Sequence, residues 1–271
     1  MTDRLANAAM PPTADSGPLA PHQPLTDYYA NDEAARQQYV RRVFDATAPD
    51  YDRIEWLMAF GSGPWYRRWA LARAGLARGM RVLDVGTGTG LTAAQAVTLI
   101  GDPTLLTGVD PSPGMLANAR LPAGVRVLEG RAEALPVASA QFDFLSMGFA
   151  LRHVSDLSRV FGEFHRALKP GGRVCVLEIT RPRSARAQWW LKQYMRRVVP
   201  LMARVAGRTR DMPELMRYYW DTIEACVPPD QVMAALRAAG FTNVARHVEL
   251  GIFSEYTGTA SAAGRDEAAA A

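Results

Sequence analysis

The chain has 271 residues, with 31 Lys and Arg against 27 Asp and Glu, and a formal net charge of +4. Apolar residues make up 48% of the chain, a globular value that excludes wholesale disorder. No apolar run reaches the roughly 18 residues of a membrane span, and the first residues lack the apolar core of a secretory signal. Two cysteines, Cys175 and Cys226, are too few for a disulfide framework or a four-ligand zinc site. We therefore expect a cytoplasmic protein without a metal.

The two ends of the chain differ in composition from the rest. Residues 1–25 hold five prolines and little apolar content, which predicts a disordered tail. Residues 259–271, rich in alanine, are expected to form a second such tail. Residues 26–77 have helical spacing with regularly placed aromatic residues, and we expect them to form a helical cap.

From residue 81 onward the hydrophobic pattern changes to short apolar runs bounded by glycine, which is typical of buried parallel strands. We expect strands within 81–85, 105–110, 125–130, 142–147, 172–179, 243–250 and 252–258, and helices at 92–100, 113–119, 156–168 and 229–239. This alternation predicts an α/β fold with a Rossmann-like, doubly wound, mostly parallel seven-stranded sheet. Residues 181–220 would form a helical insertion after the fifth strand, with Pro200 interrupting or kinking it.

The first of these strands ends in Val82-Leu-Asp-Val-Gly-Thr-Gly-Thr-Gly90, the most informative stretch of the chain. Three glycines directly after a buried strand let the backbone turn sharply and approach a ligand closely. The spacing differs from a dinucleotide fingerprint, and Asp84 before the turn would repel a pyrophosphate but suit a cationic amino-acid ligand. Asp110 ends the next strand, where an acid can accept both hydroxyls of a ribose.

On these residues the chain resembles class I S-adenosylmethionine-dependent methyltransferases. VLDVGTGTG is similar to their first motif, GVDPSPGMLANAR to the second, EGRAEALPVASAQFDF to the third, and ALKPGGRVCVLE to the approach to the fifth strand. Three further stretches are most similar to the ubiquinone/menaquinone C-methyltransferase family: VFDATAPDYD, FALRHVSD and YYWDTIEACVPP. The resemblance implies that S-adenosylmethionine is the cofactor and that the acceptor is a quinol-type aromatic ring, methylated on carbon.

The resemblance also assigns residues to the cofactor: Tyr51, Asp84, Gly86, Thr87, Gly88, Gly90, Asp110, Pro111, Met115, Arg131, Ala132 and Met147. It implies that Asp84 and the glycine turn hold the methionine part, and that Asp110 binds the ribose. Met115 would pack on the adenine beside a backbone contact from Ala132, although helix-face methionines are also common core residues. Arg131 stands where the family usually has an acid.

Activation of the acceptor is expected from Arg152 and His153, just after the fourth strand. A cation can stabilise a phenolate, and an imidazole with a pKa near 6.5 can take its proton. The family usually has Asn at position 153. The alternatives are an ion pair of Arg152 with Asp156, four residues on, and a packing role for His153. Phe149, Tyr219 and Trp220 are expected to line the acceptor pocket, although such aromatic residues are also common in cores.

The insertion carries most of the positive charge. Residues 181–210 hold nine cations and no acid, so subtracting nine from +4 leaves −5 for the rest. Residues 186–205 mix these cations with Trp189 and Trp190, a pattern that suits peripheral contact with an anionic membrane and a lipid-tailed acceptor. A helical hairpin over the acceptor pocket and a homodimer contact are the alternatives.

Other functions remain open at this stage. The segment from Gly251 to Tyr256 departs from the family pattern, so an O- or N-methyltransferase acting on another small acceptor is one alternative. A non-catalytic S-adenosylmethionine-binding protein is another. Nucleic acid is not expected as a partner, because the cations form no continuous stripe with stacking aromatic residues.

Overall fold

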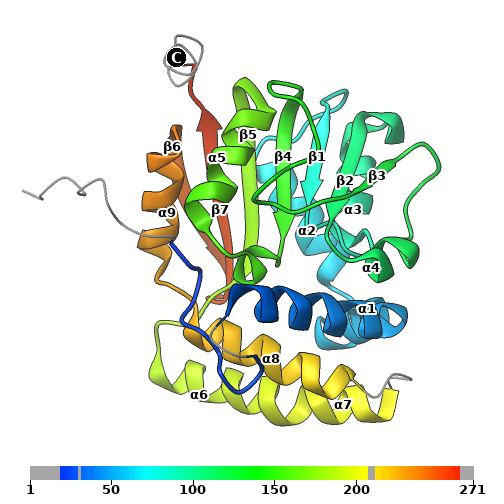
Figure 1. The fold of residues 1–271 in the computed structure, drawn as a ribbon, viewed down its shortest axis with the longest axis vertical. Coiled ribbons are helices and arrows are strands. Elements are labelled where there is room, and N and C mark those ends of the chain that lie inside the picture. The colour runs from blue at the N-terminus through cyan, green and yellow to red at the C-terminus, as the bar shows by residue number, and fades with distance from the viewer. Residues whose placement is uncertain (1–18, 30–31, 207–210, 263–271) are drawn as a thin grey trace, which may run out of the picture.

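The computed structural model describes residues 19–29, 32–206 and 211–262. A seven-stranded sheet in the order β3-β2-β1-β4-β5-β7-β6 forms its centre (Figure 1). The strands are β1 (Val82–Val85), β2 (Leu106–Asp110), β3 (Arg126–Glu129), β4 (Phe142–Gly148), β5 (Leu168–Ile179), β6 (Phe241–Glu249) and β7 (Phe253–Ala260). The first five strands pair in parallel, and β7 pairs antiparallel with both β5 and β6. The predicted Rossmann-like, mostly parallel sheet is confirmed.

Helices cover both faces of this sheet because each strand returns to it through a crossover. The helices are α1 (Glu33–Met58), α2 (Gly63–Arg73), α3 (Leu91–Ile100), α4 (Pro113–Ala117), α5 (Leu157–Ala167), α6 (Ala185–Gln193), α7 (Val199–Ala206), α8 (Met212–Ala225) and α9 (Pro229–Ala238). Residues of α2 and α3 share one buried cluster with the strands, and residues of α5 and α9 share another. The sheet is therefore buried on both sides, as its continuous apolar strands require.

A separate helical layer lies along one end of the sheet. Figure 1 shows α1, α6, α7 and α8 together below the strands. This layer has its own core, to which α1 contributes Tyr39, Val43 and Ile54, and α7 and α8 contribute Val199 and Trp220. The expected helical cap and helical insertion thus pack on one another, across more than 130 residues of chain.

The insertion changes its helical pitch where a proline was expected to disturb it. Between α6 and α7, residues Tyr194–Val198 form a π-helix, and the N–H of Val199 donates to the carbonyl of Tyr194. Pro200 follows immediately, and a proline has no N–H and clashes with the carbonyl four residues earlier. A wider turn at this point continues the helix without a break. The insertion also extends beyond residue 220, since α8 ends at Ala225.

The segment 19–29, which we call the N-terminal strap, corrects the expected tail boundary at residue 25. Backbone N–H groups of Leu157 and Val227 donate to the carbonyls of Leu19 (2.9 Å) and Pro21 (2.8 Å). The Tyr28 hydroxyl donates to Asp221 (2.5 Å), and the His22 side chain is buried. Composition alone missed this segment because its stability comes from contacts with α5 and α8. The rest of the predicted tail, residues 1–18, lies outside the described residues.

The C-terminal boundary needs a smaller correction. Strand β7 runs to Ala260, which is 2% exposed and pairs with Phe241, so residues 259 and 260 belong to the sheet. Residues 263–271 of the predicted tail lie outside the described residues.

Candidate active site

A cavity of about 590 Å³ lies between the sheet and the helical layer. Its walls come from the ends of β1, β2, β3 and β4 and from α1, α2 and α8, so it opens where parallel α/β sheets usually bind ligands. Many of the residues predicted to form the site line it: Tyr51, Gly86, Thr87, Gly88, Asp110, Pro111, Met115, Arg131, Ala132, Met147, Phe149, His153 and Tyr219. The predicted residues Asp84, Gly90, Arg152 and Trp220 are not among the described residues that line it.

The glycine turn forms one wall of the cavity. Gly86 and Gly88 have φ values of 67° and 56°, in the left-handed region that favours glycine. A Cβ at Gly86 would lie 2.6 Å from the Cβ of Ala150, so the two chain segments meet too closely for a side chain. Gly90, also left-handed, instead ends the turn and begins α3. The backbone of the turn thus borders the cavity directly, as a cofactor site needs.

Asp84 supports this turn from beneath. It is fully buried and accepts hydrogen bonds from the hydroxyls of Thr87 (2.8 Å) and Ser146 (2.6 Å). Burial raises the pKa of Asp84 to about 6, while the two hydroxyls oppose that rise. The predicted direct contact with the methionine part does not fit this position, because the carboxylate is used inside the protein. Asp84 is better described as the residue that shapes the turn.

Asp110 meets the cavity from the end of β2. Its two carboxylate oxygens accept the backbone N–H groups of Gly88 (2.8 Å) and Ser112 (2.9 Å). Burial raises the pKa of Asp110 to about 6. Each oxygen keeps a further lone pair, so the side chain can accept two more hydrogen bonds. This arrangement fits the two hydroxyls of a ribose.

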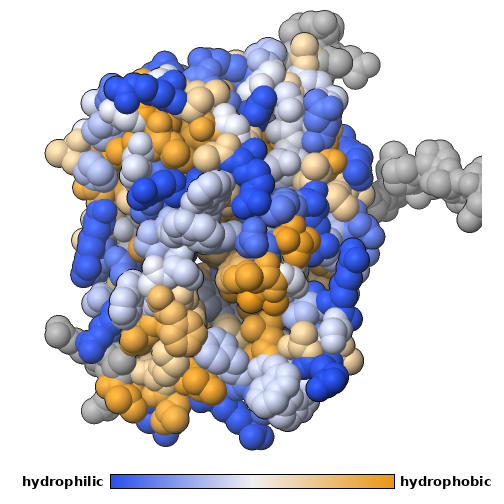
Figure 2. Space-filling model, turned by 180° about the vertical axis from the view of Figure 1, so that it is seen from behind, coloured by the Kyte–Doolittle hydropathy of each residue, from blue (hydrophilic) through white to orange (hydrophobic). Residues whose placement is uncertain are grey.

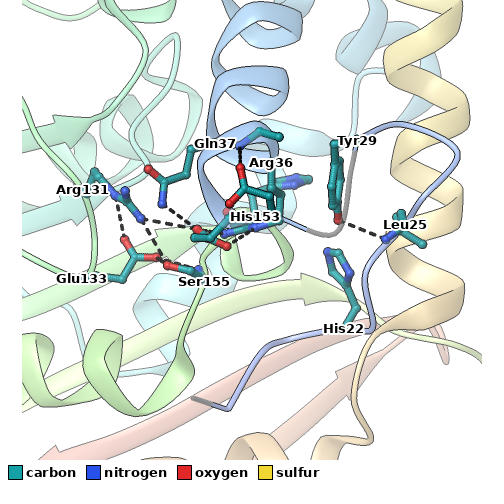
Figure 3. Close-up of polar contacts among 12 residues, drawn as sticks. His22, Leu25, Tyr29, Arg36, Gln37, Arg131, Glu133, His153 and Ser155 are labelled. Carbon is teal, nitrogen blue, oxygen red and sulfur yellow. Dashed lines mark hydrogen bonds and ion pairs between the residues drawn. The ribbon is translucent and has the colours of Figure 1, made fainter. Parts of the chain in front are cut away.

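The far end of the cavity fits a flat apolar base. Met115, which is 2% exposed, lies near the first turn of α4, and Pro111 and Ala132 line the same end. Arg131 pairs with Glu133 (3.4 Å) and donates to the Ser155 hydroxyl (3.2 Å), as Figure 3 shows. The acid that the family usually has at position 131 is therefore replaced by an arginine held at the rim.

Two carboxylates of α1 fasten the helical layer to the cofactor end, and the sequence analysis missed this role. Asp45 accepts the Ser112 hydroxyl and the Gly114 N–H (2.9 Å), both at the start of α4. Asp52 accepts the hydroxyl of Thr89 in the glycine turn (2.5 Å). Asp45 and Asp52 are seven residues apart, two helical turns, and so face the same side of α1. That spacing in VFDATAPDYD was the available signal.

The opposite end of the cavity is aromatic. The hydroxyls of Tyr51 and Tyr219 lie 2.6 Å apart, the ring of Phe44 lies 6.3 and 6.1 Å from their rings, and Phe149 lines the same cavity. Phe149 has a φ of 61°, a strained conformation for a bulky residue of the kind found at functional sites. Burial raises the pKa of Tyr219 well above its ordinary value, so its hydroxyl stays protonated.

His153 lies on this aromatic wall, stacked between the rings of Tyr218 and Tyr219. Neither ring nitrogen has a hydrogen-bond partner among the described residues. Burial, and then the charge of Arg152, lower the pKa of His153 well below its usual range. The expectation of an imidazole with a pKa near 6.5 is therefore wrong: the ring is neutral at pH 7 and is a weak base.

Arg152 lies behind the cavity wall and not in it. Its Nε donates to Glu178 at 2.9 Å, and both side chains are 1% exposed. Its Nη1 donates to the carbonyl of Tyr219 and to the hydroxyl of Thr222, both at 3.2 Å. Arg152 is not among the described residues that line the cavity, which does not fit the expected contact with the acceptor, and the alternative partner, Asp156, instead caps α5 by accepting the N–H of Ser158. Arg152 thus fixes the backbone that carries Tyr219.

Trp220 and the last strand also differ from expectation. The Trp220 indole N–H donates to Glu224 (3.1 Å) on the side of α8 away from the cavity. Strand β7, where the sequence departs from the family, reaches the aromatic end only through Phe253, whose ring lies 6.4 Å from that of Phe149. Glu255 in the same strand is buried against Arg73 (3.2 Å). The part of β7 that differs from the family pattern therefore supports the walls of the cavity more than it lines them.

The fold, the glycine turn and the paired strand-end carboxylates define a class I S-adenosylmethionine-dependent methyltransferase. A solved structure of such an enzyme from Thermotoga maritima, a possible histamine N-methyltransferase, shares the fold with a TM-score of 0.57 at 23% identity, covering 82% of this chain and 99% of that one. The [4+2]-cyclase SpnF matches with a TM-score of 0.59 at 19% identity, covering 83% and 96%. At such identities only the fold is shared.

Sequence comparison identifies the family within this class of methyltransferases. The model of the ubiE/COQ5 methyltransferase family matches residues 32–260. A demethylmenaquinone methyltransferase of Roseiflexus castenholzii is 35% identical, covering 82% of this chain and 94% of the relative. A ubiquinone/menaquinone biosynthesis C-methyltransferase UbiE of Rubrivivax gelatinosus is also 35% identical, covering 87% and 92%. The chain belongs to the ubiE/COQ5 methyltransferase family, which confirms the predicted family and enzyme class, with S-adenosylmethionine as the methyl donor.

Proposed function

We propose that this methyltransferase transfers the methyl group to a ring carbon of a quinol-type aromatic acceptor; its relatives, named as a demethylmenaquinone methyltransferase and a ubiquinone/menaquinone biosynthesis C-methyltransferase, support this. The observation that carries this proposal is the aromatic end of the cavity, formed by Phe44, Tyr51, Phe149, His153 and Tyr219, next to the glycine turn. An aromatic acceptor can pack on such rings edge-to-face or offset-stacked, the arrangements that aromatic pairs prefer at centroid distances of about 4.5–7 Å. An aliphatic acceptor would not gain this pairing.

The chemistry needs alignment and a nucleophilic ring carbon. When bound, S-adenosylmethionine supplies an electrophilic methyl carbon on its sulfonium. The aromatic wall would hold the acceptor ring in line with that carbon and exclude water. Loss of a phenolic proton makes the ring carbon more nucleophilic, and the Tyr51–Tyr219 hydroxyl pair would donate a hydrogen bond to the developing phenolate oxygen.

His153 is the proposed proton acceptor. Its ring is neutral, the form that a base needs, and it lines the cavity beside Tyr219. Burial and the charges of Arg152, His22 and Arg36 disfavour its protonated form, so the ring would hold the phenolic proton only while the methyl group moves from sulfur to carbon, and would release it to solvent as the product leaves. A comparison of His153→Asn with His153→Phe tests this role. If the Phe variant, with its protein folded, turns over as fast as the parent, His153 is not the base.

The test of the substrate is direct. The purified protein is incubated with S-adenosylmethionine carrying a labelled methyl group and with a demethylated quinol of short side chain, under reducing conditions. Mass spectrometry should show one added methyl, and NMR should place it on a ring carbon. A methyl on oxygen would favour the alternative O-methyltransferase, and no transfer to any quinol would reject the quinol assignment.

Contact with a lipid surface is proposed for the outer face of α6 and α7. Met195, Val199 and Ala203 face the protein at a helical spacing and are buried. The opposite side exposes apolar residues among cations: Trp189 (54%), Trp190 (65%), Leu201 (61%) and Val205 (80%). Figure 2 shows hydrophobic side chains gathered over the lower part of the molecule, where the helical layer lies. A basic amphipathic surface of this kind suits a lipid-tailed acceptor.

Two features bear on the alternatives for the insertion. Of the described helices of the insertion, α8 alone lines the cavity, through Tyr219, so α6 and α7 lie outside its lining. No described helix is long and apolar enough to cross a membrane. Cytoplasmic location and a homodimer contact stay predictions. Flotation with anionic vesicles at low salt tests the lipid contact: Trp189→Ala with Trp190→Ala should reduce flotation, while Leu250→Ala, an exposed residue of the turn between β6 and β7, should not. Unchanged flotation, or none by the parent, would reject it.

A further inference from the structure

A buried ion pair in the cavity wall has no assigned role. Arg67 of α2 donates from Nη1 to Oε1 of Glu55 near the end of α1, at 2.7 Å. The side chains are 5% and 15% exposed, respectively. Arg67 lines the cavity, and its guanidinium carbon lies 5.0 Å from the centre of the Phe149 ring. A cation is thus fixed at the cavity by one carboxylate and one aromatic face.

This arginine has hydrogen-bonding capacity that the protein leaves unused. A guanidinium has five N–H donors, and among the described residues Glu55 is the acceptor that the side chain meets. The Nε is buried and has no partner in the described part of the chain. An unpartnered buried charged donor costs several times the value of an ordinary hydrogen bond. A ligand that brings a hydrogen-bond acceptor to this donor would remove that cost.

The position of Arg67 relates it to the methionine end of the donor. Its neighbour Arg68 donates to Gln95 of α3 at 2.9 Å, so α2 lies against the helix that follows the glycine turn. Gly86 and Thr87 of that turn line the same cavity as Arg67. The adenine end, near Met115 and Ala132, belongs to the other side of Asp110 along the sheet.

The chemistry of the donor fits this placement. The methionine part carries a carboxylate that is ionised at every working pH, because an α-carboxyl has an ordinary pKa of about 3.5. Arginine binds carboxylates through two parallel N–H donors, a geometry that a point charge does not offer. A phenolic acceptor, with a pKa of about 10, is neutral when it binds and gains less from a permanent cation. We propose that Arg67, oriented by Glu55, binds the carboxylate of the donor's methionine part.

The inference rests on the donor site outlined above, and its test uses binding of the donor alone. Calorimetry would compare S-adenosylmethionine with its decarboxylated form, which keeps the adenosine, sulfonium and amine. The parent protein should bind the complete donor roughly 10- to 100-fold more tightly, the range expected for hydrogen bonds to a charged group. Arg67→Gln should lose that factor for the complete donor and leave the decarboxylated donor unchanged.

Two further variants separate recognition from support of the fold. Arg67→Lys should keep part of the discrimination, because it keeps the charge and loses the paired donors. Arg68→Gln, one residue along the same helix, should bind both donors as the parent does. The proposal is overturned if the parent binds both donors equally, if Arg67→Gln weakens both equally, or if it weakens neither. The parent comparison stands even if a variant fails to fold.

The outcome is independent of the acceptor. Failure to methylate any quinol would remove the proposed substrate and leave the donor comparison intact. If Arg67→Gln instead raised the KM for the acceptor with donor affinity unchanged, the arginine would serve the acceptor, and the proposed contact with the donor would be overturned.

Discussion

The buried pair of Arg152 and Glu178 offers the sharpest test of how this site is built. We expect Arg152→Met to remove the cation and leave a carboxylate that is 1% exposed without its charged partner. Breaking one side of a buried ion pair costs about 3–5 kcal/mol of unfolding free energy. For a domain of this size that corresponds to a fall of roughly 6–20 °C in the melting temperature. Burial already raises the pKa of Glu178, and loss of Arg152 would raise it further.

A second substitution distinguishes support from chemistry. Glu178→Leu in the Arg152→Met background removes the orphaned carboxylate, and we expect it to restore most of the lost stability. If Arg152 serves the site only by balancing the buried charge of Glu178, the double variant should also recover part of kcat, with donor affinity close to that of the parent. Glu178→Leu alone serves as the control, because it leaves an unpartnered cation and should destabilise to a similar degree.

Urea denaturation followed by tryptophan fluorescence measures the stabilities, and turnover is measured with the same preparations. Two results would refute the reasoning. One is an Arg152→Met variant as stable as the parent, which would mean that the pair contributes nothing to the fold. The other is a double variant that regains stability but has no residual activity, which would mean that Arg152 is needed in its own right, through its bonds to Tyr219 and Thr222 or at the acceptor, and not only as the partner of Glu178.

Three other predictions follow from the site and the strap. Gly86→Ala should abolish measurable donor binding by calorimetry, because the new Cβ would lie 2.6 Å from a neighbouring carbon at a φ of 67°; binding at the parental level would contradict the close approach. Donor affinity should rise as the pH increases through about 6. Asp110 must be ionised to accept both ribose hydroxyls, and its raised pKa of about 6 means that it is fully ionised only above that pH. Asp110→Asn should flatten this profile, and a slope that persists would assign it to Asp84, which has the same pKa. Tyr28→Phe should lower the unfolding free energy in urea by about 1.5 kcal/mol through loss of its bond to Asp221, and no change would mean that the strap adds nothing through this contact.

Ionisation of Asp110, which favours donor binding, has the opposite effect on the stability of the fold. The folded pKa of Asp110, about 6, lies above the ordinary value of 3.8, so the unfolded chain loses its proton first. The contribution of this group to stability is present below about pH 4 and is lost as the pH rises through 6. Asp110→Asn should therefore be more stable than the parent at pH 7 and bind the donor less well. Stability and function are in conflict at this position.

The order of strands and helices along the chain, and much of the donor end of the site, could be predicted from the amino-acid sequence. Apolar period and strand-end chemistry are local properties, so the runs around Asp84 and Asp110 predicted the sheet, and their resemblance to methyltransferase motifs implied the cofactor. The family stretches also identified the aromatic residues Phe149 and Tyr219. These signals depend on residues that are neighbours along the chain.

Which side chains reach the cavity depends on the three-dimensional fold and could not be predicted. Arg152 pairs with Glu178, 26 residues away, and not with Asp156, because β4 and β5 lie side by side. His153 lost its expected titration to burial against residues of α8. The strap joined the fold through contacts with residues more than 130 positions along the chain. Burial and long-range pairing fix charge states and orientations, and no period in the sequence records them.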